Sequence, residues 1–192
     1  MIILNKIIIA VFKTIAIFII ATVFLTMAFT TFTIFMTYSK MENVAYMMQG
    51  ELSRNNRLLG STTVGGASID YYAKQLDDIC KQTVARNNSG GQIVVLDYIT
   101  IVEANNNSIT YQLPDGATGC TITTNGYTEP ADRADIVGNY GDVKKIEIHY
   151  TTHFLTAVVN NGTANITMEQ LDGTTGTQHT LTVYAPCLRY IK

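Results

Sequence analysis

The sequence has very little charge at its amino-terminal end and no surplus of basic residues along its length. From Met1 to Thr37 the only charged side chains are Lys6 and Lys13. Over all 192 residues, 13 Lys and Arg stand against 15 Asp and Glu, a formal net charge of −2. Nucleic-acid binding depends on clustered basic side chains, so this balance predicts no nucleic-acid partner.

The sequence also lacks the common signatures of catalysis. It contains no GxSxG elbow, no P-loop and no context for a Cys–His nucleophile. His149 and His153 are four residues apart, but in a strand this spacing covers about 13 Å, too far for two ligands to share one ion. The adjacent carboxylates Asp77 and Asp78 fit a solvated helix face. We therefore expect no enzymatic activity, no metal and no cofactor.

An uncharged segment dominates the amino-terminal part of the chain. No charge occurs from Thr14 to Tyr38, and a helix of this length crosses a hydrocarbon core of roughly 30 Å. The alternative is a cleaved signal peptide, for which Thr26-Met27-Ala28 is the only passable site. Because the apolar run continues well past this site, the pattern favours a retained membrane anchor in contact with lipid.

Basic residues near the ends of the span predict its orientation. Lys6, Lys13 and the amino terminus precede it, whereas Lys40, Arg54 and Arg57 follow at increasing distance. By the positive-inside rule the short amino-terminal flank is cytoplasmic. The sequence thus predicts a single-pass protein of the cell membrane with residues 40–192 outside.

The span continues into a polar region without a stop signal. One apolar stripe recurs there at helical spacing, and its members are Met41, Val44, Ala45, Met48 and Leu52. The pattern ends at Leu59-Gly60, as a helix carboxyl terminus does. We expect one membrane-spanning and amphipathic stalk helix in residues 1–60. Its stripe packs against its own domain, against a neighbouring copy, or against both.

Residues 61–192 predict an extracytoplasmic α+β head. A second stripe at helical spacing includes Ile69, Tyr72, Leu76 and Cys80. The rest is typical of strands separated by turns. These strands are expected at 92–103, 108–113, 121–123, 143–159, 163–171 and 177–184, with the last three forming an antiparallel meander. The strand at 143–159 alternates clearly. One face is predicted to carry Ile146, Ile148, Tyr150, Thr152 and Phe154, and the other Lys145, Glu147, His149, Thr151 and His153. The predicted fold class is α+β, with a long helix, a short helix and an antiparallel β-sheet head.

Three cysteines lie on the expected outer side of the membrane. An oxidising exterior permits one disulfide and leaves one thiol. Cys120 and Cys187 are the first candidates for this bridge, because Cys80 fits the helix stripe as a small hydrophobe. A chain without any bridge is the alternative.

This architecture resembles that of type IV pilins and pseudopilins. The order helix, helix, sheet, with Gly-Asp-Val-x-x-Ile-x-Ile-x-Tyr from Gly141 to Tyr150, is most similar to TadE-like minor pseudopilins and related single-span proteins of Gram-positive conjugative elements. The chain departs from the family at 5–10, where neither a prepilin cleavage site nor a following Glu is present. The resemblance implies a pilin-like fold and a role in a surface filament.

Three functional hypotheses follow. In the first, the protein is a structural subunit whose helix stripe packs against copies of itself or related pilin-like subunits in a filament or envelope assembly. In the second, it is a membrane-tethered binding or adhesion module that does not assemble. Its unknown surface ligand would contact Tyr98, Tyr111, Tyr127 and Tyr140. The third, an anchored enzyme, requires a reactive pair of residues that the sequence does not offer.

Overall fold

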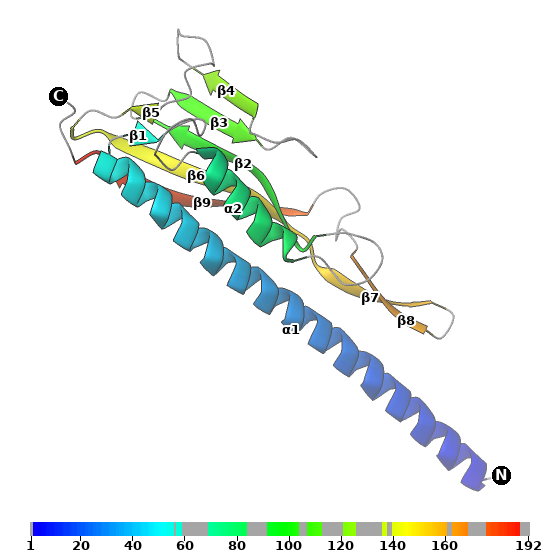
Figure 1. The fold of residues 1–192 in the computed structure, drawn as a ribbon. Helices are drawn as coiled ribbons and strands as arrows, with labels where there is room; N and C mark the ends of the chain where they lie inside the picture. Colours follow the sequence, from blue (N-terminus) through cyan, green and yellow to red (C-terminus); the bar gives the residue numbers. More distant parts are fainter. Residues whose placement is uncertain are drawn as a thin grey trace.

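The architecture is that of a computed structural model of the whole chain (Figure 1). The structure describes residues 2–55, 57–58, 69–83, 92–103, 107–112, 121–125, 136–137, 140–160, 163–168 and 176–188. Within these ranges the fold is α+β, with a long apolar amino-terminal helix, a short second helix and an antiparallel sheet.

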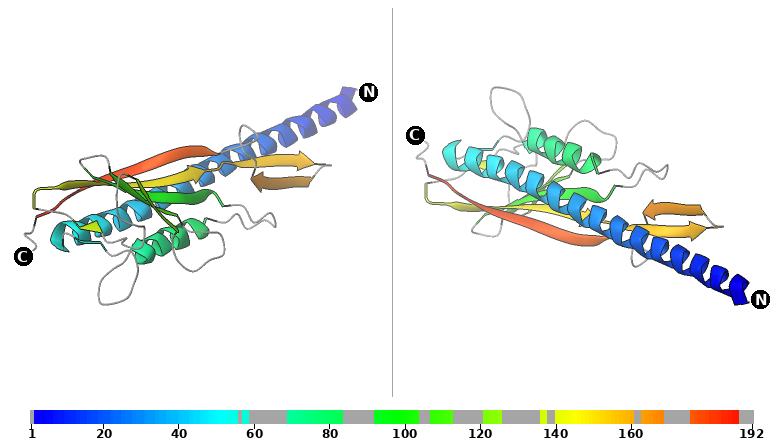
Figure 2. Two further views of the ribbon diagram at one scale, coloured as in Figure 1. Left: turned by 90° about the horizontal axis from the view of Figure 1, so that it is seen from above. Right: turned by 90° about the horizontal axis from the view of Figure 1, so that it is seen from below.

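Helix α1 runs from Ile2 to Asn55, a length of 54 residues without interruption. This confirms the expected fusion of an apolar and an amphipathic segment in one helix. Its amino-terminal half projects from the head, while its carboxyl-terminal half lies along the sheet (Figures 1 and 2). Helix α2, Ile69–Lys81, packs beside α1 and buries the stripe predicted for it, Cys80 included.

Five antiparallel strands form the main sheet in the order β4-β3-β2-β6-β9. Their bounds are β2 Val94–Val102, β3 Ser108–Gln112, β4 Thr121–Asn125, β6 Val143–Thr152 and β9 Thr177–Pro186. Two short strands, β1 Arg57–Leu58 and β5 Ile136–Val137, pair separately. The helices cover one face of the main sheet (Figure 2), and the core lies between these two layers.

The expected strand 143–159 is divided in two, and the expected meander is wrong. Strand β6 ends at Thr152, and β7, Leu155–Asn160, begins after His153 and Phe154. Strand β7 pairs with β8, Thr163–Met168, in a separate two-stranded sheet. Strand β9 then returns to pair with β6 along its whole length. The β7–β8 hairpin therefore extends beyond the main sheet, toward the amino-terminal end of α1 (Figure 1).

Candidate functional site: the faces of the long helix

The amino-terminal half of α1 is uncovered by the head. Large apolar side chains point outward on all sides of the helix here, among them Ile7, Phe12, Ile17, Phe18, Phe24 and Leu25. The segment Asn5–Arg54 contains a window with mean hydropathy 2.7 in which no residue is buried. By length and composition α1 can cross a membrane, and the exposed apolar side chains are suited to contact lipid.

Seven threonines of α1 satisfy their own hydroxyl groups within the helix. Each donates a hydrogen bond to the carbonyl oxygen four residues earlier, at 2.8–3.0 Å. A hydroxyl bonded in this way leaves no unpaired donor in an apolar environment. Thr26, Thr30 and Thr37 of this set are buried against the head, so the head first covers α1 at Thr26.

The stripe predicted to pack the amphipathic half lies in the core of the head. Its members have at most 5 % exposure: Met41, Val44, Ala45, Met48 and Leu52. They pack with residues of α2 and of the inner sheet face in one cluster. Of the two expected settings for this stripe, the structure shows its own domain. Its role in assembly stays a prediction.

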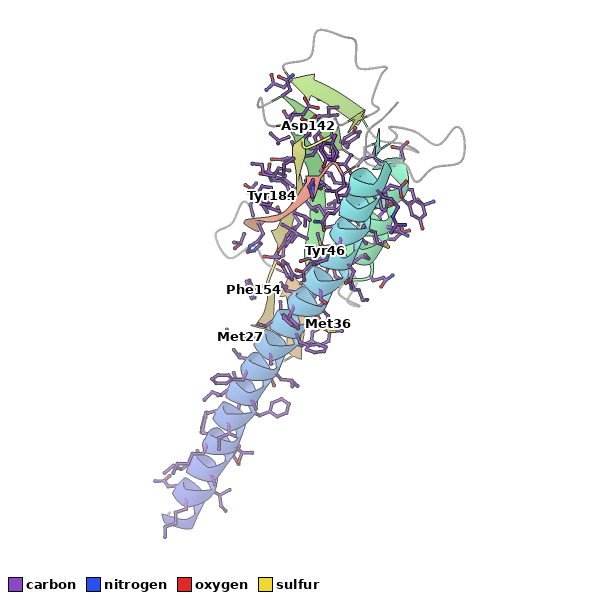
Figure 3. All side chains as sticks on the ribbon, turned by 90° about the vertical axis from the view of Figure 1, so that its left-hand side faces the viewer. Met27, Met36, Tyr46, Asp142, Phe154 and Tyr184 are labelled. Carbon is purple, nitrogen blue, oxygen red and sulfur yellow. The ribbon has the colours of Figure 1, made fainter. Side chains whose placement is uncertain are left out.

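The opposite face of α1 retains large apolar side chains in solvent. Phe32, Met36, Tyr46 and Met47 are exposed, as are Leu25 and Phe29. Those up to Met36 continue the apolar surface of the span, and after the exposed Lys40 and Asn43 the pair Tyr46 and Met47 lies on the outer side of the head. Figure 3 shows Met27, Met36 and Tyr46 at successive levels of this helix. Sequence periodicity did not single out this stripe, because in the apolar half hydrophobic residues occur on every side of the helix. In the amphipathic half, the only sequence sign of this exposed face is the pair of apolar residues Tyr46 and Met47 next to the buried Met48.

Two hydrogen bonds attach the carboxyl-terminal end of α1 to the last strand. Gln49 donates from Nε2 to the carbonyl oxygen of Tyr184 at 2.7 Å, and the backbone N–H of Leu188 donates to the carbonyl oxygen of Ser53 at 3.3 Å. The first bond occupies a carbonyl group of the edge strand β9. These bonds hold the distal half of α1 on the head, so the helix and the sheet form one body there.

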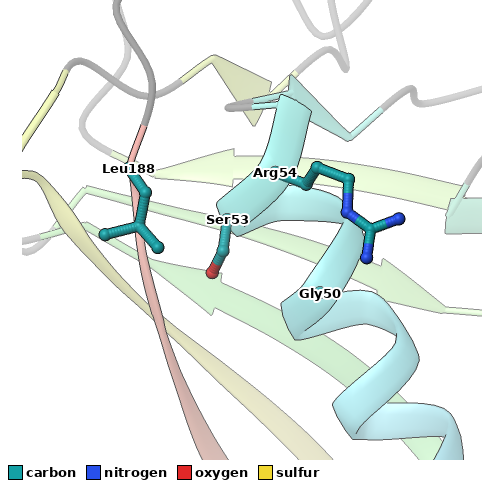
Figure 4. A pocket seen from close by; sticks show the side chains of 4 residues that line it. All are labelled: Gly50, Ser53, Arg54 and Leu188. Atoms are coloured by element: carbon teal, nitrogen blue, oxygen red, sulfur yellow. The ribbon is translucent and has the colours of Figure 1, made fainter.

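A shallow pocket lies at this junction, lined by Gly50, Ser53, Arg54 and Leu188 (Figure 4). The Arg54 side chain extends away from Leu188, so the polar groups do not converge on a common point. Ser53 Oγ is buried and, in the described part of the chain, has no hydrogen-bond partner. These four residues offer no acid–base pair for chemistry.

The outer face of the sheet is polar and carries a small network. His149 stacks on Tyr98 with ring centroids 4.3 Å apart, and its Nδ1 lies 3.2 Å from Thr180 Oγ1. Glu147 lies between Lys145 at 2.8 Å and His149 Nε2 at 3.6 Å. The strand alternation predicted for 145–152 is thus confirmed, with Ile146, Ile148, Tyr150 and Thr152 buried on the inner face.

The tyrosines proposed as ligand contacts are placed differently from one another. Tyr98 and Tyr140 are exposed, whereas Tyr111 has 1 % exposure in the core. Tyr111 is therefore wrong as a surface contact: on β3 it lies on the same inner face as Ile109. Tyr127 lies outside the described residues.

Both cysteines in the described ranges are buried free thiols, Cys80 and Cys187. Burial, aided by Asp77 and Asp97, raises the pKa of Cys80 to about 12. Burial also raises the pKa of Cys187. A thiol with a raised pKa is a poor nucleophile because little thiolate is present at neutral pH. Cys120 lies outside the described residues, so the Cys120–Cys187 bridge stays a prediction.

Among the residues that the structure describes, no group of three His, Cys, Asp or Glu side chains is arranged to hold a metal ion. Comparison of the chain with protein-family models, with curated proteins and with solved structures finds no match. What the geometry defines is a class: an α+β head on a helix long and apolar enough to cross a membrane.

Proposed function

We propose that this chain is a membrane-anchored structural subunit of pilin or pseudopilin type, without enzymatic activity. Helix α1 anchors it in the cell membrane, with the amino terminus in the cytoplasm and the head outside. It then packs against copies of itself or related subunits in a filament or envelope assembly. The observation that carries the proposal is the division of α1 into an uncovered apolar half and a half built into the head.

The physical argument rests on what can replace lipid around the apolar half. A helix with outward apolar side chains on all sides is stable in a bilayer and unstable in water, because each large side chain transferred to water costs about 1.5–3 kcal/mol. It can leave the membrane when other helices cover it, as in the core of a helical assembly. Because the helix continues into the head without a break, the head is carried along with it.

We assign subunit contact to the exposed stripe of α1, which comprises Leu25, Phe29, Phe32, Met36 and Met47. The stripe first expected in this role, which includes Met48, packs into the head of its own subunit. The exposed stripe runs from the uncovered half to Met36, and Met47 resumes it on the outer side of the head, beyond the exposed Lys40 and Asn43. A second copy of α1 laid along it would cover apolar surface on both sides of the membrane boundary.

A test is to shear the producing cells and to look for the chain in the released material by electron microscopy and mass spectrometry. We expect it in filaments, and the mass of its amino-terminal peptide then reports whether Met1 is retained. A chain that remains wholly with the membrane fraction contradicts the filament role.

The second candidate is a tethered binding module, supported by the uncovered outer face of the sheet. Tyr184 is 59 % exposed on this face, where its strand partner is Lys145, and the stacked Tyr98 and His149 lie further along the same face. Aromatic side chains in a polar surface are common in recognition sites. In this case a charged substitution in the exposed stripe of α1 leaves ligand binding intact, whereas Tyr184→Ala reduces it.

A further inference from the structure

The β7–β8 hairpin lies beside the part of α1 that continues directly from the span. It extends past the end of the main sheet toward the amino terminus, and β7 contacts α1 (Figures 1 and 2). The head first buries α1 at Thr26 and Thr30, so the head and the apolar helix overlap along the chain axis.

The other side of α1 at this level is strongly apolar and uncovered. Met27, Phe29, Phe32, Phe35 and Met36 are all exposed there. In water these side chains would be unfavourably hydrated, whereas in lipid they would not. The part of α1 that lies beside the start of the hairpin is therefore better suited to lipid than to water.

The positions of the charged residues in α1 indicate the same depth of the helix in the membrane. The charge-free part of α1 lies between Lys13 and Lys40 and comprises residues 14 to 39, about 39 Å of helix. If lipid begins just after Lys13, a hydrocarbon core of roughly 30 Å ends near residue 34. If the bilayer instead stopped at Thr26, Lys13 would lie deep in the hydrocarbon and the phenylalanines would lie in water. The position of Lys13 and the exposure of the phenylalanines therefore both favour a hydrocarbon core that extends to about residue 34.

The hairpin itself is suited to this position. From Ile148 to Met168, a range that includes the hairpin, the chain has no Asp, Glu, Lys or Arg, the longest such run outside α1. In the observed register, apolar residues pair with apolar residues at alternate positions of the two strands. This face of the hairpin consists of Leu155, Ala157, Val159, Ala164, Ile166 and Met168.

Backbone hydrogen bonding limits how deep the hairpin can lie. In the described part of the chain β8 pairs with β7 alone, which leaves one edge of β8 with unpaired N–H and C=O groups. Such groups are not tolerated in the hydrocarbon core, but the headgroup region supplies water and phosphate oxygens. The favourable depth is therefore the outer interface of the bilayer.

We propose that the β7–β8 hairpin is a membrane-contacting element that sits in the outer lipid interface beside α1 and sets how close the head lies to the membrane. The inference rests on the proposed role of α1 as the anchor. It adds a second lipid contact, made by a segment far from α1 in the sequence.

The sequence contains no Trp, so a single introduced Trp reports on one position. We would place Trp in the hairpin as Val158→Trp and, separately, as Ile166→Trp, which lie on opposite faces of the strand pair. Phe24→Trp in the uncovered half of α1 is the lipid control, and Thr182→Trp on the outer sheet face is the water control. Each full-length variant is reconstituted at low protein density in vesicles of phosphatidylcholine and phosphatidylglycerol. Two sets of lipids carry bromine on the acyl chains, one set near the headgroup and one near the chain ends, because Phe24 lies near the middle of the hydrocarbon core and the hairpin near its outer edge.

We expect bromine to quench Phe24→Trp and at least one hairpin variant, and to leave Thr182→Trp bright. If Phe24→Trp is quenched while both hairpin variants behave like Thr182→Trp, the hairpin is in water and the inference is wrong, although the anchor stands. If Phe24→Trp is also unquenched, the anchor itself is wrong. Circular dichroism of each variant verifies the native helix and strand content.

Discussion

At the scale of single residues, two glycines make a matched test of packing. A Cβ placed on Gly176 would collide with the carbonyl oxygen of Thr152 and lie 2.7 Å from the ring of His153, whereas a Cβ on Gly50 would meet nothing within 4 Å. Gly176 thus permits the close approach of the chain entering β9 to the end of β6. Gly50 is in the interior of α1, where Ala is preferred.

We expect Gly176→Ala to destabilise the protein by about 1–3 kcal/mol through overpacking. Gly50→Ala should stabilise it by about 1 kcal/mol through helix propensity. Thermal unfolding of the full chain in detergent, followed by the strand signal in circular dichroism, measures both. Equal effects of the two substitutions would contradict the packing assigned to Gly176.

Single residues also show where sequence patterns are sufficient to predict which side chains are buried. Alternation along 145–152 correctly separated the buried Ile146 and Ile148 from the outer Lys145 and Glu147. Helical spacing correctly placed Cys80 in the core. Tyr111 was misassigned because its exposure was judged from residue type alone, whereas the alternation of Ile109 and Tyr111 with Thr110 and Gln112 places it on the inner face.

At the scale of elements, adjacent methionines on α1 separate folding from assembly. Met48 has 0 % exposure in the core, and Met47 has 47 % exposure on the opposite stripe. We expect Met48→Glu to destabilise the head by about 3 kcal/mol or more, because it buries an unpaired carboxylate. If Met48 instead faced a neighbouring copy, the same substitution would block assembly and leave the head folded.

Met47→Glu is the matched variant, with the same change of side chain one residue away. We expect it to keep the native circular dichroism spectrum and unfolding temperature, since its carboxylate is solvated. In sheared cells it should lower the yield of assembled material strongly, because a charge interrupts the proposed contact stripe. Normal assembly by Met47→Glu would remove that stripe from the interface.

The long helix could be predicted because its apolar run passes directly into an amphipathic pattern, with no Pro and only one Gly within it. The end of β6 could not be predicted from the sequence. His153 and Phe154 carry no turn signal, and the alternating pattern of β6 continues through them into β7. Contacts between distant parts of the chain determine where β6 ends. The backbone N–H of His153 donates to the carbonyl oxygen of Ile93 at 2.8 Å, and beyond this bond the chain leaves the main sheet. Sequence reasoning therefore found the strands and the pairing of β7 with β8, but missed that this hairpin is separate from the main sheet.

At the scale of the whole molecule, the proposed orientation depends on few charges. Lys6 and Lys13 precede the span closely, whereas Lys40 follows it with Glu42 nearby. Lys and Arg are retained on the cytoplasmic side during insertion. The head, with its polar outer sheet face, then lies outside the cell, where a filament subunit or a binding module has to be.

Two single substitutions test this orientation with one reagent. Thr182→Cys places a thiol on the exposed outer face of the sheet, and Asn5→Cys places one at the start of the span. We expect a membrane-impermeant maleimide to label Thr182→Cys in intact cells, and to label Asn5→Cys only after permeabilisation. Peptide mass spectrometry distinguishes these sites from the native cysteines, of which Cys80 and Cys187 are buried. The reverse labelling pattern would place the head in the cytoplasm, and both the filament and the tethered-module proposals would then lose their basis.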